Sequence, residues 1–342
     1  MMDTLAGWTA DFIVNAAWQI PTIAVISYAA LRVMGRPHPR VEHLVWTAAL
    51  VASVALPAWA ATQPGGSGSP ALLVESPWLA AELLGLAFLA SLALGAFSFA
   101  RSWSYVRRLR RLPALADPSD EMLQVAESCA QALAITTPQV KICDVQGPAT
   151  IGVTHPVVLL PQDFSSQEDG AVLRAAIGHE AAHIARKDYL VNLLAELLSI
   201  AIGAHPVTYW IKRHLKASRE KACDAVVADR VLSSRDYARS VLSLAAANGA
   251  GREVRLAPGV LDGGDLASRL RALLDRRTYA TSLASRVVLL VAAAALLVVG
   301  WNSAHWLRPK MPEFSPAVPK APPPPPKELK RRLSDANPNT QQ

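Results

Sequence analysis

Hydrophobic residues in this chain are gathered into long runs that contain almost no charged residues. Four such runs occur, at about residues 12–33, 44–62, 78–100 and 286–307. About 20 apolar residues in a helix span the hydrocarbon core of a membrane, which is about 30 Å thick. We therefore predict four transmembrane helices, three of them within residues 1–100.

Basic residues border these runs and indicate their orientation. Arg36 and Arg40 separate the first two runs, and five arginines between Arg101 and Arg111 follow the third without an intervening acid. Short cytoplasmic loops carry an excess of Lys and Arg. We therefore expect the N-terminus and the C-terminus to lie on the outer, non-cytoplasmic side of the membrane. Residues 101–285 are then expected to form one cytoplasmic domain.

Composition favours a membrane protein over a soluble or nucleic-acid-binding one. Hydrophobic residues make up 51% of the 342 residues, charged residues make up 18%, and the net charge is +7. The basic residues lie beside the apolar runs, so the lipid bilayer is the expected partner and direct nucleic-acid binding is not expected. The three cysteines are far apart in the chain, which argues against a disulfide framework and indicates a reducing compartment.

Within residues 101–285, helical patterns outnumber strand patterns. A helix start at Asp117-Pro118-Ser119 and a capping box at residues 165–168 predict two helices, the second continuing through Ile177. β-branched residues predict strands at Val140–Val145 and Thr150–Leu160. Further helices are expected at about 206–230, 235–247 and 264–275.

The expected fold class is thus an α-helical membrane protein with four transmembrane helices and a mainly helical α+β cytoplasmic domain. The uncharged stretch Leu197–Ile211 is short for a transmembrane span, so we expect a buried or interfacial helix there. After the fourth span, residues 308–342 form a Pro-rich tail that we expect to be exported. Its run of prolines is typical of an extended polyproline segment, and a partner-binding tail and a disordered one both remain open.

The clearest chemical motif is His179-Glu180-Ala181-Ala182-His183 on the helix predicted after the capping box. Residues four apart share one face of a helix, so the two imidazoles can bind one ion. Zinc suits these donors and leaves a position for water in a catalytic site. Zinc lowers the pKa of bound water from about 16 toward about 7, and Glu180 is placed to act as the general base.

A third ligand is expected downstream of this motif. The candidates are His205, His214, Glu196 and Glu220. If residues 218–224 are helical, Glu220 and Asp224 share one face, so Glu220 could complete the ligand set while Asp224 accepts the free N–H of a ligating histidine. An exposed charged helix face is the alternative. Cys223 is interpreted as a core thiol rather than a fourth ligand.

These motifs together resemble the BlaR/MecR-type antirepressor metallopeptidases. The resemblance rests on residues 179–188, on an apolar helix ending at His205-Pro206, on Arg219-Glu220 with Cys223-Asp224, on residues 147–161, and on residues 43–57. It implies a bacterial inner-membrane protein with a cytoplasmic gluzincin-type domain between the third and fourth helices. It also implies one Zn²⁺ ion held by His179, His183 and Glu220, with Glu180 as the base.

In family members with the full layout, an extracellular penicillin-binding sensor follows the last helix. Binding of a β-lactam there activates the peptidase, which processes itself and relieves a winged-helix repressor. After Leu307 this sequence has about 35 residues, so we expect no such sensor domain here and a signal from a separate sensor partner. A homodimer is a further partner that remains open.

The resemblance also suggests how a substrate is held. A strand beside the active-site helix pairs with extended substrate, and Val157, Val158, Leu159 and Leu160 are the candidate strand. Arg276-Arg277 is a candidate self-cleavage site, although basic residues that mark the inner membrane face are the better explanation of this pair.

Three functions are therefore open for this chain. The first is a regulatory endopeptidase that cleaves itself or a cytoplasmic transcriptional repressor. The second is a membrane quality-control zinc protease, and the third is a non-catalytic signalling scaffold with structural zinc. Glu180 argues against the scaffold, because a structural zinc site has no use for a base at that position.

Overall fold

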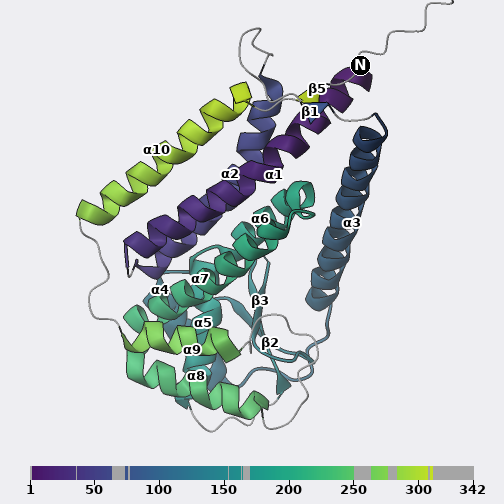
Figure 1. Cartoon of the computed structure of the whole chain (residues 1–342). Helices are drawn as coiled ribbons and strands as arrows, with labels where there is room; N and C mark the ends of the chain where they lie inside the picture. The colour runs from purple at the N-terminus through teal and green to yellow at the C-terminus, as the bar shows by residue number, and fades with distance from the viewer. Residues whose placement is uncertain are drawn as a thin grey trace, which may run out of the picture. The chain divides into compact units, whose positions relative to one another are not determined.

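The computed structural model describes residues 2–35, 37–63, 74–75, 78–152, 154–162, 164, 170–249, 263–275, 283–306 and 309–310, all within one unit that spans Met1–Lys310. These residues are mainly helical (Figure 1). In chain order the elements are α1 (Met2–Val33), α2 (Pro39–Thr62), β1 (Val74–Glu75), α3 (Trp78–Arg110), α4 (Asp120–Leu133), β2 (Gln139–Ile142), β3 (Ala149–Ile151), β4 (Val157–Leu160), α5 (Gly170–Ala185), α6 (Asp188–Ile202), α7 (Pro206–Arg230), α8 (Ser234–Gly249), α9 (Gly263–Leu274), α10 (Leu283–Trp306) and β5 (Pro309–Lys310).

Three helices are long and apolar enough to cross a membrane, and they match the first three predicted spans. The qualifying segments are Trp8–Val33 in α1, Pro39–Thr62 in α2 and Gly85–Arg110 in α3. α3 continues through the arginine-rich segment to Arg110 instead of ending near residue 100. In α10 the apolar segment Ser285–Trp301 is shorter, so the fourth span stays a prediction.

The long helices pack against one another through apolar side chains. α1 contacts α2 and α10, and α10 also contacts α2, as Figure 1 shows. Ile20, Ile23, Trp46 and Leu50 are almost fully buried between α1, α2 and the elements next to them. By contrast, no residue in the apolar window of α3 is buried, which is unfavourable in water and typical of a lipid-facing helix.

A three-stranded sheet lies beside α4 and α5, in the order β2-β4-β3. β4 pairs in parallel with β2 and antiparallel with β3. The single strand expected at 150–160 is therefore wrong, because the chain reverses between Ile151 and Val157. Gly152 has a φ of +101°, which glycine adopts readily, and it allows the chain to leave β3 there.

The remaining helices form a core with the sheet. Ser119 caps α4 by accepting a hydrogen bond from the Met122 N–H, as the Asp-Pro-Ser sequence predicted. α7, α8 and α9 confirm the helices expected near 206–230, 235–247 and 264–275. The capping box at 165–168 lies outside the described residues, and the active-site helix is described from Gly170.

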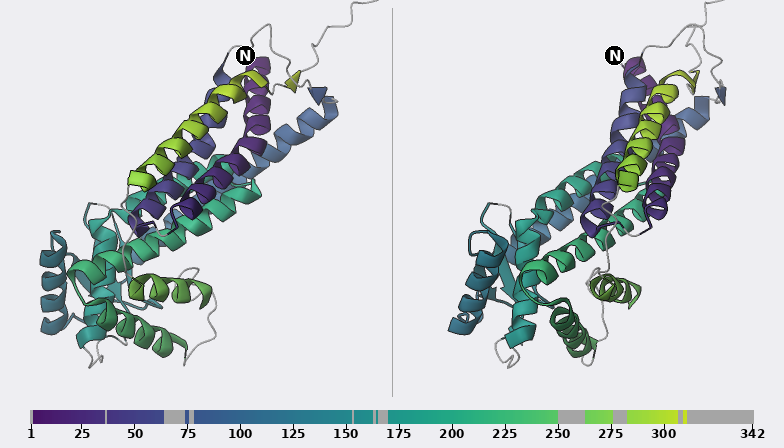
Figure 2. Two further views of the ribbon diagram at one scale, coloured as in Figure 1. Left: turned by 60° about the vertical axis from the view of Figure 1, so that its left-hand side comes forward. Right: turned by 90° about the vertical axis from the view of Figure 1, so that its left-hand side faces the viewer.

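The helix expected at Leu197–Ile211 is wrong as one element, because α6 ends at Ile202 and α7 begins at Pro206. The residue before a proline is disfavoured in a helix, and His205 instead caps α7 by accepting a hydrogen bond from the Val207 N–H at 3.3 Å. The two helices form a hairpin that packs alongside the long helices (Figure 2).

Candidate metal centre

One turn of α5 carries the residues of the predicted zinc motif. His179 and His183 lie four residues apart, and their rings are almost perpendicular, with centroids 4.8 Å apart. α7 crosses α5 and contributes Glu220. The crossing is close: a Cβ added at Gly178 would lie 3.1 Å from Val231 Cγ1, just beyond the end of α7. The two helices therefore bring residues 41 positions apart into one cluster.

The donor atoms of these three side chains fit a tetrahedral zinc ion. His179 Nε2 lies 3.2 Å from His183 Nε2 and 3.3 Å from Glu220 Oε2, and His183 Nε2 lies 3.9 Å from Glu220 Oε2. Ligands about 2.0–2.1 Å from zinc in tetrahedral geometry lie about 3.3 Å from one another. His179, His183 and Glu220 could therefore occupy three corners of a tetrahedral metal site.

Hydrogen bonds at Nδ1 orient both imidazole rings. His183 Nδ1 donates to Asp188 Oδ2 at 2.9 Å, and Arg186 Nε donates to the same oxygen at 3.1 Å. His179 Nδ1 donates to the hydroxyl of Tyr237 at 2.9 Å. These bonds put the proton of each neutral ring on Nδ1, so each Nε2 presents its lone pair to the cluster.

Behind His179 lies a buried network from three helices. The Tyr237 hydroxyl of α8 donates to Asp224 Oδ1 at 2.8 Å, and Asp224 Oδ1 itself lies 3.3 Å from His179 Nδ1. Arg269 of α9 donates to both Asp224 oxygens, at 2.7 and 2.8 Å. Asp224 thus lies beside a candidate ligand, held by a tyrosine and an arginine.

The carboxylates concentrate negative charge around the two rings. Burial lowers the pKa of His179, but hydrogen bonds with Asp224 and Glu220 outweigh this effect and raise the pKa to about 9. Burial raises the pKa of Asp188, but its hydrogen bond with His183 and the charge of Arg186 outweigh burial and lower it to about 2. The pKa of Glu220 is also held well below its usual range, because its contacts with the two histidines outweigh burial. Asp188 and Glu220 are therefore ionised at neutral pH, beside the two imidazoles.

Glu180 lies on the neighbouring face of α5, at the edge of a cavity. Its carboxylate is buried and accepts a hydrogen bond from the Thr150 hydroxyl of β3 at 2.7 Å. The cavity has a volume of about 560 Å³, and Glu180 and His183 line one side of it. Thr150, Gly152 and residues at the start of α6 are among its other lining residues. The cavity is therefore bordered by both Glu180 and the candidate ligand His183.

The strand expected to hold a substrate, Val157–Leu160, is β4, and it lies in the centre of the sheet. Its two edges are occupied by β2 and β3, so it has no free row of backbone groups to offer a peptide. β3, which carries Thr150, is the edge strand beside the cavity. In the described sheet, β3 (Ala149–Ile151) therefore has an edge without a strand partner, whereas Val157, Val158, Leu159 and Leu160 have strands on both sides. Which strand holds a substrate stays a prediction.

The three other candidates for the third ligand lie away from the cluster. Glu196 pairs with Lys212, His214 stacks on Trp46, and His205 caps α7. Cys223 is fully buried, and its sulfur lies 3.2 Å from His183 Nδ1 and donates to Asp188 Oδ2 at 3.0 Å. Arg276-Arg277 lies outside the described residues.

Sequence reasoning missed four residues of the centre: Asp188, Tyr237, Arg269 and Thr150. Asp188 follows His183 by five residues, so its reach to the ring could have been anticipated from that spacing. Tyr237 and Arg269 are 58 and 90 residues from His179 in sequence, and neither belongs to a recognisable local motif. Only packing of α8 and α9 against α7 reveals them.

Comparison with known proteins gives two matches. The sequence model of the BlaR1 peptidase M56 family matches residues 8–273. The "Regulatory protein BlaR1" of Bacillus licheniformis is 33% identical over 86 residues, which are 24% of this chain and 14% of that protein. The matched segment is thus a small part of the relative, whereas the family match includes the first three long helices, α5 and α7.

Proposed function

Because the chain belongs to the BlaR1 peptidase M56 family, we propose that it is a membrane-bound zinc endopeptidase that acts in regulatory signalling. The observation that carries this proposal is the meeting of His179, His183 and Glu220 in tetrahedral spacing, next to Glu180 at the cavity. A structural zinc site needs no free corner and no adjacent carboxylate base, so this arrangement favours catalysis over a scaffold.

The proposed reaction is hydrolysis of a peptide bond in the cavity beside α5. His179, His183 and Glu220 would hold the zinc ion, which would supply a Lewis acid for the peptide carbonyl and for a water molecule. Glu180 takes a proton from the attacking water and delivers it to the leaving amine. Thr150 fixes the Glu180 carboxylate through its 2.7 Å hydrogen bond, and the free edge of β3 holds an extended substrate through backbone pairing.

The proposed substrate is a protein on the cytoplasmic side. In this topology four helices span the bacterial inner membrane, with both termini outside and residues 101–285 facing the cytoplasm. A winged-helix repressor and the chain itself are the candidate substrates, in keeping with the regulatory title of the Bacillus licheniformis relative. A separate sensor would supply the signal.

Glu180→Gln tests the reaction against its alternatives. The amide preserves shape but cannot act as a base, so we expect zinc content near wild type and cleavage reduced by about 100-fold or more. Cleavage is measured in cells that also carry a winged-helix repressor encoded beside this gene, by following repressor turnover and new protein N-termini. Glu127→Gln, on the exposed face of α4, is the matched control.

Each outcome decides between the functions. Loss of a single repressor cleavage in the variant supports regulatory proteolysis, and loss of many cleavages supports quality control. Equal cleavage by the wild type and Glu180→Gln, with zinc retained in both, overturns the peptidase mechanism.

A further inference from the structure

We infer that the α6–α7 hairpin is a further membrane-embedded element, which enters the bilayer from the side of the candidate metal centre and contacts lipid chains through one face of α6. This inference goes beyond the proposed peptidase activity and does not depend on it. It rests on three features of the hairpin: the depth of its tip, the distribution of its exposed leucines and the position of its charges.

The tip of the hairpin lies beside the middle of α1. His205 Nδ1 accepts from the Val207 N–H, so Nε2 carries the ring proton, and it lies 3.4 Å from the carbonyl oxygen of Ala17. Ala17 is near the centre of the span Trp8–Val33. Tyr28, nearer the C-terminal end of α1, packs on Trp210 and is taken as the level of the membrane interface. Ala17 lies roughly 16 Å along α1 from Tyr28, at 1.5 Å per residue, which is about half the thickness of a hydrocarbon core.

α3 gives an independent measure of the same depth. A Cβ added at Gly95 would lie 3.2 Å from the Cα of Ile200, so the last turn of α6 packs closely on α3. Close approach at a small residue is typical of helix pairs in membranes. Gly95 precedes Arg101, the first basic residue after the apolar run, by roughly 9 Å along the helix. The end of α6 therefore lies at the level of the apolar run of α3, deeper in the predicted membrane than Arg101.

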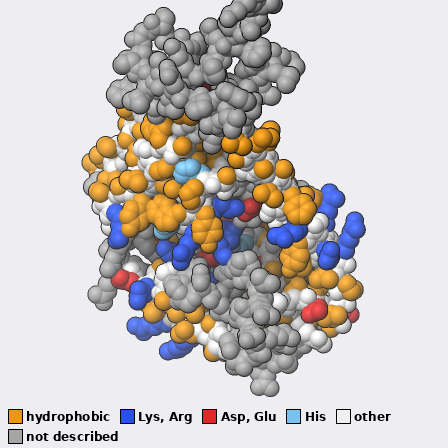
Figure 3. Space-filling model, turned by 45° about the vertical axis from the view of Figure 1, so that its right-hand side comes forward, with side chains coloured by type: hydrophobic (Ala, Val, Ile, Leu, Met, Phe, Trp, Pro, Cys, Tyr) orange, Lys and Arg blue, Asp and Glu red, His pale blue; other side chains and the backbone are white. Residues whose placement is uncertain are grey.

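The exposed face of α6 is apolar. Leu190, Leu194 and Leu197 share one helical face, and they are 49%, 46% and 45% exposed. On the opposite face, Ala195 and Ile202 are buried against the long helices. On the face shown in Figure 3, hydrophobic side chains form a broad band over the long helices, and Lys and Arg side chains gather along its lower border. α6 packs beside α3, whose apolar window is also exposed.

The charges of the hairpin lie where a bilayer tolerates them. Glu196 accepts a hydrogen bond from Lys212 at 2.9 Å, so the acid in the interior of α6 is paired within the hairpin. Glu196 precedes Ile200 by roughly 6 Å along α6, which puts it near the level of Arg101. A lysine at that level can extend its ammonium group to the interface. Trp210 packs on Tyr28 and Trp46, as aromatic residues do at membrane interfaces.

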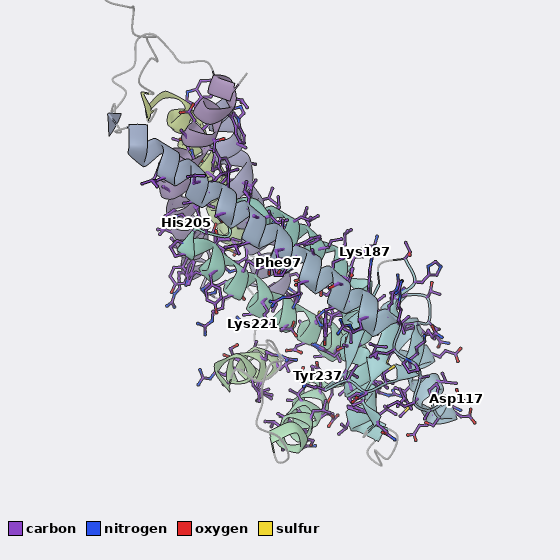
Figure 4. The ribbon with its side chains drawn as sticks, turned by 90° about the vertical axis from the view of Figure 1, so that its right-hand side faces the viewer. Phe97, Asp117, Lys187, His205, Lys221 and Tyr237 are labelled. Atoms are coloured by element: carbon purple, nitrogen blue, oxygen red, sulfur yellow. The ribbon has the colours of Figure 1, made fainter. Side chains whose placement is uncertain are left out.

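The hairpin also positions the candidate metal centre. α6 begins at Asp188, the acceptor of the His183 ring proton, and α7 continues from the tip down to Glu220. Figure 4 shows His205 among the long helices, away from Asp117 and Tyr237 of the sheet-containing part. An embedded hairpin therefore holds the centre directly below the membrane surface.

Spin-label accessibility in bilayers tests the inference. Leu190→Cys, Leu194→Cys and Leu197→Cys are labelled with a nitroxide in the full chain, reconstituted in vesicles of phosphatidylcholine and phosphatidylglycerol. Collision with oxygen, which concentrates in lipid, is compared with collision with a water-soluble nickel chelate. The wild type is the labelling blank, because all three of its cysteines are buried.

Two variants calibrate the measurement. Leu123→Cys, on α4, replaces a leucine that is 45% exposed like Leu197 but lies outside the long helices, and Leu94→Cys lies on the exposed face of α3. We expect the oxygen-to-nickel ratio to rise from Leu190 to Leu194 to Leu197. At Leu197 it should be several-fold above Leu123 and close to Leu94.

Two results would overturn the inference. A ratio at Leu197 equal to that at Leu123 means that the face is in water. An immobilised label that neither reagent reaches means that protein, such as a second copy or a substrate, covers the face instead of lipid.

Discussion

At the scale of single residues, the orientation of two imidazole rings decides whether the centre can hold a metal. Asp188 holds the ring of His183 and also accepts from Arg186 and Cys223. Asp224 and Tyr237 do the same for His179. Residues in this role fix the tautomer and raise the basicity of the ligating nitrogen.

Asp188→Asn should weaken zinc binding. The amide removes the negative charge that stabilises the His183 ring, so we expect the zinc affinity to fall by about 10- to 100-fold. Competition with a chelator of known affinity measures the change. Asp236→Asn is the control, because the Asp236 side chain is 54% exposed and its partners Ser233 and Arg239 lie outside the metal cluster. Equal affinities of the two variants would show that Asp188 does not act on the metal site.

Zinc affinity should also depend on pH. The pKa of His179 is raised to about 9, so below that value a proton competes with the metal for its ring. A single displaced proton makes the affinity rise by about tenfold per pH unit up to that pKa. Titrations at several pH values between 6.5 and 8.5, with calorimetry in buffers of different ionisation enthalpy, measure the slope and the released proton. A flat profile over this range contradicts the assigned pKa.

At the scale of elements, α9 is joined to the centre by one buried ion pair. The Arg269 side chain is 10% exposed and the Asp224 side chain is 2% exposed, so neither charge has water as an alternative partner. α9 is also the last described helix before α10, the fourth predicted span. The pair therefore links the segment next to that span with a carboxylate beside His179.

Arg269→Met should destabilise the domain and disturb the metal centre. Methionine is similar in length but leaves the Asp224 charge unpaired, which costs about 3 kcal/mol or more in a buried site. Thermal unfolding and zinc titration measure the two effects. Arg271→Met on the exposed face of α9 is the matched control and should change neither. Wild-type stability of Arg269→Met would contradict the role given to this pair.

At the scale of the whole described unit, the metal-binding helices pack directly on the membrane helices. Lys221, next to Glu220, donates to Glu42 at the start of α2, at 3.1 Å. One turn away, Ser218 Oγ lies 3.4 Å from His43 Nδ1, and both residues are buried. α2 is therefore joined directly to the helix that carries Glu220.

A charge exchange tests this junction. Glu42→Lys and Lys221→Glu should each lower the melting temperature, and the double variant should recover part of the loss, with a coupling energy of about 1 kcal/mol. Thermal unfolding in nanodiscs measures all four proteins. The Asp236–Arg239 pair, whose side chains are 54% and 80% exposed, should show almost no coupling in the same cycle. Additive losses at Glu42 and Lys221 would mean that the two helices are not joined by this pair.

The sequence alone determined the features of the protein that depend on local periodicity and on the length of apolar segments. Three long apolar helices follow from run length, because each backbone group in a membrane must be satisfied within its own helix. The pairing of His179 with His183 follows from four-residue spacing on α5, and Glu220 and Asp224 share a face of α7 for the same reason. The family resemblance was confirmed by the match over residues 8–273.

Tertiary structure alone decided which distant side chains meet. Tyr237 and Arg269 reach the centre because α8 and α9 pack against α7, and no local pattern carries that information. Likewise, strand order left β4 enclosed and β3 at the edge, although Val157–Leu160 is the more apolar segment. The hairpin between α6 and α7 was hidden in a single uncharged run. Hydrophobicity records how strongly a segment avoids water, and only packing determines whether it is buried by protein or by lipid.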